Sequence, residues 1–312
     1  MAESSSTSSS RRAFTRLLLP VMAGIVLGCW LMDLLAMRFL ILPARSAGAY
    51  KVHRMFTGNA PDEVPILGSS RAAGSYVPER IDAHAFDYGI EKTEHELVEV
   101  MLAEELRKER RTPILINWDF EFFQHKVGNM AHFVPNLEHP TVRAYVAEEL
   151  HWYHRFPGLR FFGLYDDYLK ALLGERSKGN VRSAGGVFDN GRHDRSRFQE
   201  QVRRRLATQM RWIDPQGKDS VFLDLVRSTD RRIIIVAAPY HRSYFTNFKD
   251  LGAAQAYLAG LDSLVNVTVL DHSRDELPDV DFLNTSHVNY TGAQVFSERL
   301  GREWTALFPD RR

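Results

Sequence analysis

The chain has 312 residues, of which 44% are hydrophobic and 25% charged, and its formal net charge is +1. Because 40 basic residues are balanced by 39 acidic ones, bulk electrostatic binding to nucleic acid is excluded, and we expect no nucleic-acid partner. The single cysteine, Cys29, excludes an intrachain disulfide and a cysteine-based zinc site. We therefore expect neither a metal nor another cofactor.

The first 62 residues predict three consecutive segments. Residues 1–16 are rich in Ser and Thr and contain three Arg, which predicts a disordered lead on the cytoplasmic side. Residues 17–42 are apolar except for Asp33 and Arg38, and a helix over them reaches the roughly 30 Å of a bilayer's hydrocarbon core. Residues 43–62 then predict a short tether. This order predicts a single-pass protein of the bacterial inner (cytoplasmic) membrane, with its soluble domain on the periplasmic or extracellular side.

Three processing signals compete with a retained anchor. Residues 10–16, SRRAFTR, are similar to a twin-arginine export signal. Residues 26–29, VLGC, resemble a lipoprotein box, and the small residues 47–49 could form a cleavage site. We favour the retained anchor, and all three alternatives still place the domain outside the cytoplasm.

Residues 63–312 predict one α/β domain, with a helical and loop insertion at about residues 124–225. Short apolar runs alternate with longer helical patterns, which indicates a mostly parallel five-stranded sheet with helices on both faces. Strands are expected at 64–68, 86–90, 113–120, 232–239 and 265–271, helices at 92–108, 141–155, 159–173, 198–212, 248–261 and 291–307, and a long loop at 174–197. In such sheets the ligand site lies at the carboxyl ends of the strands.

Two of the loops at those ends contain residues suited to nucleophilic catalysis. The first strand runs into Gly68, Ser69, Ser70 and Arg71, where the glycine permits a sharp turn that lifts a hydroxyl to the rim of the sheet. A serine needs a base to remove its proton, and His287 lies in a polar loop directly before the last helix. Together they predict a serine-hydrolase type of site, although either motif alone is more often a turn or a helix cap.

The GSSR turn and the late NTSHVNYTGA loop resemble the SGNH (GDSL-like) hydrolase superfamily. More narrowly, they resemble its membrane-anchored branch, with the D-alanyl transfer protein of teichoic acids and the acetylation proteins of alginate and cellulose. The resemblance implies a flavodoxin-like fold, Ser70 as nucleophile and His287 as general base. It also implies that Gly89, with the Ser70 N–H, stabilises the oxyanion, and it makes Asn117 the nearest candidate for a third donor.

The sequence departs from this family at the third member of the triad. The family has Asp three residues before its His, whereas this chain has Asn284, which can orient an imidazole but adds no charge. Asp281 is the candidate substitute acid, with Asp279 as a second. Arg71 is expected to be solvated or ion-paired, with anionic substrate binding as the alternative.

By resemblance, the domain is an esterase or O-acyltransferase acting on a cell-envelope glycan or other polymer. A membrane-bound O-acyltransferase is then an expected partner. The competing hypothesis is a degenerate domain that binds glycan or scaffolds an envelope assembly, and Asn284 favours it.

Overall fold

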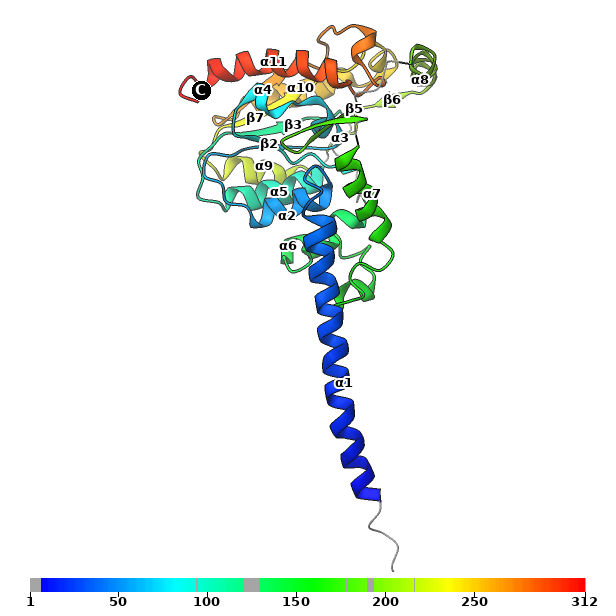
Figure 1. Ribbon diagram of the computed structural model, residues 1–312. Coiled ribbons are helices and arrows are strands. Elements are labelled where there is room, and N and C mark those ends of the chain that lie inside the picture. Colours follow the sequence, from blue (N-terminus) through cyan, green and yellow to red (C-terminus); the bar gives the residue numbers. More distant parts are fainter. Residues whose placement is uncertain are drawn as a thin grey trace, which may run out of the picture.

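The computed structural model describes residues 7–93, 95–120, 129–177, 179–189, 194–215 and 217–311, with side chains from residue 18 onward. Its centre is a five-stranded sheet in the order β2-β1-β3-β7-β9, in which every neighbouring pair is parallel (Figure 1). The strands are β1 (Val64–Leu67), β2 (Ala85–Asp87), β3 (Ile114–Asn117), β7 (Ile233–Ala237) and β9 (Val267–Asp271). The predicted α/β fold with a five-stranded parallel sheet is confirmed.

The strand sequences explain why the sheet is central. Strands β1, β3 and β7 are buried at every position, and β7 consists almost entirely of Ile and Val. Continuous β-branched runs suit a parallel sheet because both of its faces are covered. From β1 the chain moves outward to β2 and then returns to β3 on the other side. This reversal opens a crevice at the carboxyl ends of β1 and β3.

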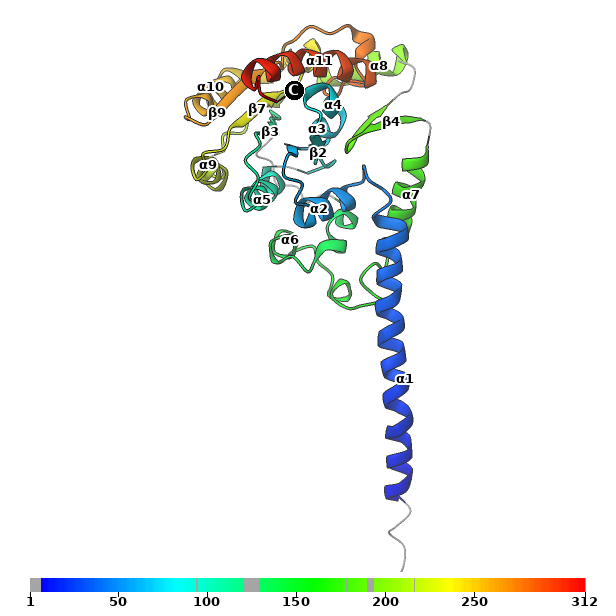
Figure 2. The same cartoon turned by 60° about the vertical axis from the view of Figure 1, so that its left-hand side comes forward.

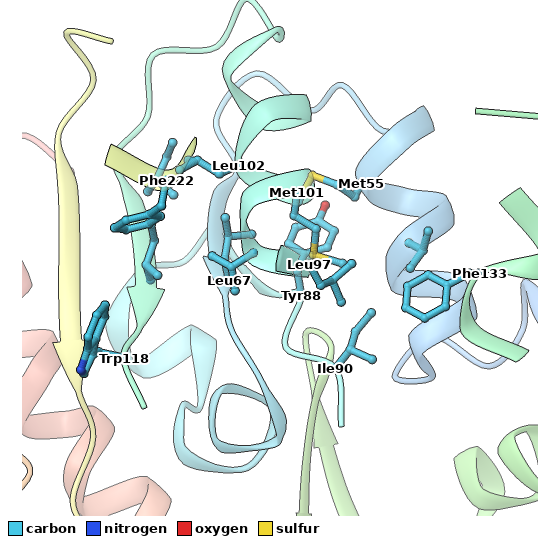
Figure 3. Packing of buried hydrophobic residues seen from close by; sticks show 14 of the residues in the cluster. Met55, Leu67, Tyr88, Ile90, Leu97, Met101, Leu102, Trp118, Phe133 and Phe222 are labelled. Atoms are coloured by element: carbon cyan, nitrogen blue, oxygen red, sulfur yellow. The ribbon is translucent and has the colours of Figure 1, made fainter. Parts of the chain in front are cut away.

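Helices cover both faces, and each face has its own apolar cluster. The larger cluster joins helices α2, α5 and α9, with residues of α10, to one face (Figure 3). The other places α11 against β1, β3 and β7 through Phe296, Leu300 and Trp304. The helices around the sheet are α2 (Gly48–Thr57), α3 (Ser70–Ser75), α4 (Pro78–Ile81), α5 (His95–Leu106), α9 (Ser220–Arg227), α10 (Leu251–Asp262) and α11 (Tyr290–Leu307).

The N-terminal part is one long helix that projects from the domain (Figures 1 and 2). Helix α1 (Thr7–Ala36) continues through a π-helical turn, η1 (Met37–Ile41). Residues 18–41 have a mean hydropathy of 2.1, so this helix is long and apolar enough to be a membrane anchor or a signal sequence. The expected disordered lead is wrong from residue 7 onward, because helix extends into the polar segment, and residues 1–6 lie outside the described part.

The predicted tether is also wrong. Residues 48–57 form α2, whose Val52 and Met55 are buried in the larger cluster. Lys51 and the other charged residues made this segment look solvated, but its apolar positions recur with helical spacing and face the sheet. The soluble domain therefore begins before residue 63.

Met55→Ala tests this correction. Met55 is fully buried, so the truncation should lower the free energy of unfolding by about 2–5 kcal/mol through lost contacts and a cavity. The exposed Thr57 on the same helix is the matched control, and Thr57→Ala should change stability by no more than about 0.5 kcal/mol. Denaturant unfolding of the full-length protein measures both. Equal, small effects would mean that α2 does not contribute to the core.

The insertion differs from its expected structure in three places. The helix expected at 159–173 runs instead from Tyr165 to Arg176. The helix expected at 141–155 is divided into α6 (Pro140–Tyr145) and the 3₁₀ turn η4 (Trp152–Arg155). The loop expected at 174–197 contains an antiparallel hairpin, β4 (Asn180–Ser183) and β5 (Gly186–Asp189). Its two turn residues, Ala184 and Gly185, both have positive φ, which is the requirement of a two-residue hairpin turn.

The remaining elements complete the chain. They are the helices α7 (Tyr165–Arg176) and α8 (Arg195–Ala207), the short paired strands β6 (Met210–Arg211) and β8 (Phe248–Lys249), and the 3₁₀ turns η2 (Met130–His132), η3 (Val134–Asn136), η5 (Arg242–Tyr244) and η6 (Asp279–Asp281).

Candidate active site

Ser70 is placed at the carboxyl edge of the sheet by a constrained turn. Gly68 follows β1 with φ +152°, and a Cβ there would lie 2.9 Å from the Cβ of Asn117. Only glycine fits this conformation and this approach. Ser69 is the N-cap of α3, and its Oγ accepts a hydrogen bond from the Arg71 N–H at 3.2 Å. Ser70 is thus the first residue of α3, directly above the end of β1.

His287 is held in a short closed loop that precedes α11. Phe282 and Val288 form an antiparallel bridge, and within it the Leu283 N–H donates to the His287 carbonyl at 2.9 Å. The His287 Nε2 lies 3.0 Å from the Ser70 Oγ, although the two residues are 217 positions apart. The structure brings these residues into hydrogen-bond reach, as expected, and their catalytic role stays a prediction.

Asn284 occupies the position of the acid in a triad. Its Oδ1 lies 3.1 Å from the His287 Nδ1 and also accepts hydrogen bonds from the backbone N–H groups of Ser286 and His287, each at 2.9 Å. The Ser286 hydroxyl donates to the same oxygen at 3.0 Å. Asn284 therefore orients the imidazole and also holds the loop that carries it. Ser70, His287 and Asn284 form a hydrogen-bonded chain, called the relay below.

Neither candidate substitute acid reaches the relay. Asp279 instead lies 3.2 Å from the Nε2 of His241 and also pairs with Arg242. In the described residues, the Asp281 carboxylate makes no hydrogen bond to His287. The backbone of Asp281 instead donates to the Pro278 carbonyl and accepts from the Asn289 N–H, each at 2.9 Å. The structure does not bring Asp281 or Asp279 into contact with His287, and their role as a substitute acid stays a prediction.

The surroundings keep His287 neutral. Burial, with a smaller contribution from the positive charge of Arg71, lowers its pKa from the ordinary 6.5 to about 4. The Ser70 hydroxyl faces Nε2, and Nδ1 lies 3.1 Å from Asn284 Oδ1 and 3.0 Å from Ser286 Oγ. Because Ser286 donates its own proton to Asn284, both oxygens are acceptors for the Nδ1–H, and Nε2 accepts from Ser70. This is the protonation state in which His287 can accept a proton from Ser70.

The two expected oxyanion donors other than Ser70 are engaged elsewhere. The Gly89 N–H donates to Asp87 Oδ1 at 2.6 Å, because the carboxylate two residues earlier folds back onto it. Asn117 is buried, with its Nδ2 donating to Asp119 at 2.9 Å and its Oδ1 accepting from Tyr76. The structure therefore does not direct either group toward Ser70, and the roles implied for Gly89 and Asn117 stay predictions. The remaining expected donor, the Ser70 N–H, lies in the first turn of α3. N–H groups in a first turn have no partner within the helix, so this one can face an oxyanion.

Arg71 connects the three segments around the relay. It is buried, and its Nε lies 2.8 Å from Asp119 Oδ1 as an ion pair. Its other nitrogens donate to the carbonyl of Ser286, beside His287, and to that of Ala238, after β7, at 2.6 Å. Its guanidinium lies 3.4 Å from the ring centroid of Tyr240. The ion-paired alternative is the one that the structure shows, and Arg71 positions the relay rather than presenting a free cation to a substrate.

Two supporting residues were missed in the sequence. Asp119 accepts hydrogen bonds from Ser69 and Asn117 in addition to pairing with Arg71. Lys51 is buried beneath the site, where its Nζ donates to the Gly89 carbonyl at 2.5 Å and lies 3.9 Å from Asp87. Burial lowers the pKa of Lys51 and raises that of Asp87 to about 6. The position of Asp119 just after β3, at the carboxyl edge of the sheet, could have identified it as a site residue. No local sequence feature distinguished Lys51 from a solvent-exposed lysine.

The relay opens into a cleft of about 490 Å³ with a polar and charged rim. Its lining includes Glu91, Lys92, Asp189, Tyr240 and Tyr244. A larger cavity of about 650 Å³ shares Tyr240 with it but contains neither Ser70 nor His287. Among the described residues, no three His, Cys, Asp or Glu side chains come together in a way that could hold a metal ion.

No protein-family model matches the chain, and no curated protein matches it. Among solved structures, a protein from Streptococcus pneumonia, described as a candidate platelet activating factor, matches with a TM-score of 0.37 and 10% identity. The match covers 93% of this chain and 99% of that one. A likeness of this degree does not define a reaction, so the function has to be inferred from the side chains of the cleft.

Proposed function

We propose that this protein is a membrane-anchored, SGNH-like serine esterase or O-acyltransferase that acts outside the cytoplasm on a cell-envelope glycan or other polymer. The observation that carries the proposal is the relay: Ser70, His287 and Asn284 in one hydrogen-bonded chain at the carboxyl edge of a parallel sheet. A nucleophile, a base and a group that orients the base are the minimum for acyl transfer through serine.

The geometry supports a two-step reaction. The Ser70 Oγ attacks the acyl carbonyl carbon while its proton passes to the His287 Nε2, and this proton then leaves with the alcohol that is released. The acyl group is now bonded to Ser70. Water or an acceptor hydroxyl attacks it, gives its proton to His287, and Ser70 recovers that proton as the acyl group departs. Hydrolysis and transfer differ only in the acceptor.

The cleft supports a polar substrate. Its rim of Glu91, Lys92 and Asp189, with the hydroxyl-bearing rings of Tyr240 and Tyr244, offers hydrogen-bond donors and acceptors to a sugar rather than a slot for a long acyl chain. The apolar helix α1 supports retention at a membrane, where an acyl donor supplied by a membrane-bound O-acyltransferase would be within reach.

Two observations favour the non-catalytic alternative, a domain that binds glycan or scaffolds an envelope assembly. Asn284 brings no charge to stabilise an imidazolium. The Gly89 N–H is also committed to Asp87, so an oxyanion would have fewer donors.

Labelling with an alkyl phosphonate that reacts with activated serines separates the two functions. If the relay is catalytic, the full-length protein should be labelled once, and peptide mapping should place the label on Ser70. A degenerate binding domain should remain unlabelled while still retaining polymer. Labelling at a serine outside the relay would also contradict the proposal.

The pH profile provides a second test. His287 acts only as the neutral imidazole, and its pKa is lowered to about 4, so kcat/KM for ester hydrolysis should stay level as the pH falls from 7 to about 5. Activity should then decrease as the pH falls through about 4, because the imidazole takes up a proton. If the rate instead falls with a pKa near 6.5, the ordinary value for histidine, then a different group or a more exposed His287 controls the reaction.

A further inference from the structure

Residues 151–164 of the insertion, HWYHRFPGLRFFGL, form a surface that we call the collar. They include five Trp, Tyr or Phe residues and two Arg but no acidic residue. Three of the aromatic side chains are left largely uncovered, with Trp152 68%, Phe156 52% and Phe162 63% exposed. A soluble surface seldom leaves so many large apolar groups in one short segment without a partner.

The collar lies directly against α1. Figures 1 and 2 both show the loops of the insertion beside the part of α1 nearest the domain. Contact is made at Gly158, where a Cβ would lie 2.5 Å from the Cβ of Cys29. Cys29 belongs to the apolar stretch Leu18–Ile41 and precedes its domain-side end by twelve residues, about 18 Å along a helix. If α1 spans a bilayer, the collar reaches the same bilayer.

The collar's backbone is suited to a water-poor layer. Successive i→i+3 hydrogen bonds join His154 to His151, Phe156 to Tyr153, Leu159 to Phe156, Phe162 to Leu159 and Leu164 to Phe161, each from N–H to carbonyl. Pro157 has no N–H to satisfy. Irregular backbone in contact with lipid is costly when its polar groups are unpaired, and these turns pair five N–H groups and five carbonyls internally.

The collar also has a distinct inner side that fixes it to the protein. Phe161 is fully buried and packs edge-on against Tyr168 of α7, with ring centroids 5.6 Å apart. The ring of His154 is hydrogen-bonded to the Arg160 carbonyl at 2.6 Å. The inner side chains are thus held in place, while Trp152, Phe156 and Phe162 remain exposed, as do many apolar side chains of α1.

We propose that the collar is a membrane-contact surface, seated in the headgroup layer and the outer half of the hydrocarbon core of the bilayer that α1 spans, which is the depth that the Gly158–Cys29 contact requires. Trp152, Phe156 and Phe162 would lie at the boundary of the hydrocarbon, where amphipathic aromatic rings are favoured. The exposed Arg155 would reach lipid phosphates, and the lack of acidic residues avoids repulsion from them. With α1 as a second contact, the domain would be held at a fixed height rather than on a flexible tether.

Fluorescence quenching of Trp152 tests this directly. The protein has five Trp; Trp118, Trp212 and Trp304 are buried in the domain, and Trp30 lies in α1. In full-length Trp30→Phe protein in phosphatidylcholine vesicles, lipid brominated at acyl positions 6 and 7 should quench part of the emission. Trp152→Phe in the same background should abolish that quenching. A matched control carries Trp30→Phe, Trp152→Phe and Val265→Trp; Val265 is fully exposed in the loop before β9, so its replacement should respond to aqueous iodide and not to brominated lipid.

Two results would overturn the proposal. In the first, Trp152 is quenched by iodide as strongly as the Val265→Trp control and is insensitive to brominated lipid, which would place the collar in water. In the second, Trp152 is shielded from both quenchers, which would mean that another protein surface, such as a second copy, covers it. Neither result depends on whether the relay is catalytic.

Discussion

Ser70→Ala should lower ester hydrolysis by at least about 10³-fold and abolish phosphonate labelling, because the variant lacks the atom that forms the acyl bond. The loss should appear in kcat with little change in KM, since the Ser70 hydroxyl contributes to the transition state rather than to polymer binding. Steady-state hydrolysis of a chromogenic acetyl ester measures the effect, and retention on immobilised polymer measures binding.

Ser69→Ala is the matched control for that change. Ser69 precedes the nucleophile, but its hydroxyl caps α3 and donates to Asp119, away from His287. Removing an N-cap should cost about 1 kcal/mol of stability, while Ser70 should still be labelled. If Ser69→Ala abolished labelling and Ser70→Ala did not, the nucleophile would have been assigned to the wrong serine. If neither change affected a measurable hydrolysis, the relay would not be the active site.

Asn284→Asp should raise the rate of ester hydrolysis by about 10²–10³-fold. The Oδ1 already lies 3.1 Å from His287 Nδ1 and accepts two backbone N–H groups, so a carboxylate can take its place without rebuilding the loop. Its negative charge would stabilise the imidazolium that forms as Ser70 attacks. In a serine protease the reverse change, Asp to Asn, costs about 10⁴ in turnover.

The same substitution should also move the pH profile. A carboxylate beside Nδ1 favours the protonated imidazole, so the pKa of His287 should rise from about 4 and the acid limb should move to higher pH. A base whose pKa is nearer the working pH is also more effective. Both changes, a higher plateau and a raised limb, are expected together in one set of pH–rate measurements.

Asp281→Asn is the control for this experiment, because it makes the opposite change in charge at the alternative acid. The Asp281 carboxylate makes no hydrogen bond to His287 in the described residues, so its removal should change the rate by less than about threefold. A large loss with Asp281→Asn, combined with no gain from Asn284→Asp, would show that Asp281 moves to serve as the acid. If Asn284→Asp protein neither hydrolyses esters nor reacts with the phosphonate, the non-catalytic alternative is correct.

Much of the fold could be predicted from the sequence because its information is local. The runs that became β1, β3 and β7 are almost entirely apolar and buried at every position, and the helical patterns between them leave a parallel sheet as the simplest solution. That sheet brings the carboxyl ends of its strands together, which is why a serine near residue 70 and a histidine near residue 287 could be expected to meet.

The insertion was harder because its local signals are weak and mixed. The β4–β5 hairpin depends on positive φ at Ala184 and Gly185, and a small residue followed by glycine predicts a flexible loop as readily as a turn. The local signal at Lys51 was clear but misleading, since a charged side chain in a short polar segment indicates exposure to solvent. Its burial is possible only because the Gly89 carbonyl and Asp87 lie where the Nζ ends.

The sequence by itself determined the apolar N-terminal helix, the alternating α/β domain and the identities of Ser70, His287 and Asn284, because these follow from composition, periodicity and motif. The tertiary structure alone decided which polar groups pair with which. It committed the Gly89 N–H to Asp87, buried Asn117 under Asp119, and made Arg71 the link between the turn after β1 and the loop of His287. The physical reason is that a hydrogen-bond donor has several acceptors within reach in the unfolded chain, and only the packed strands and helices determine which one remains close enough to bind.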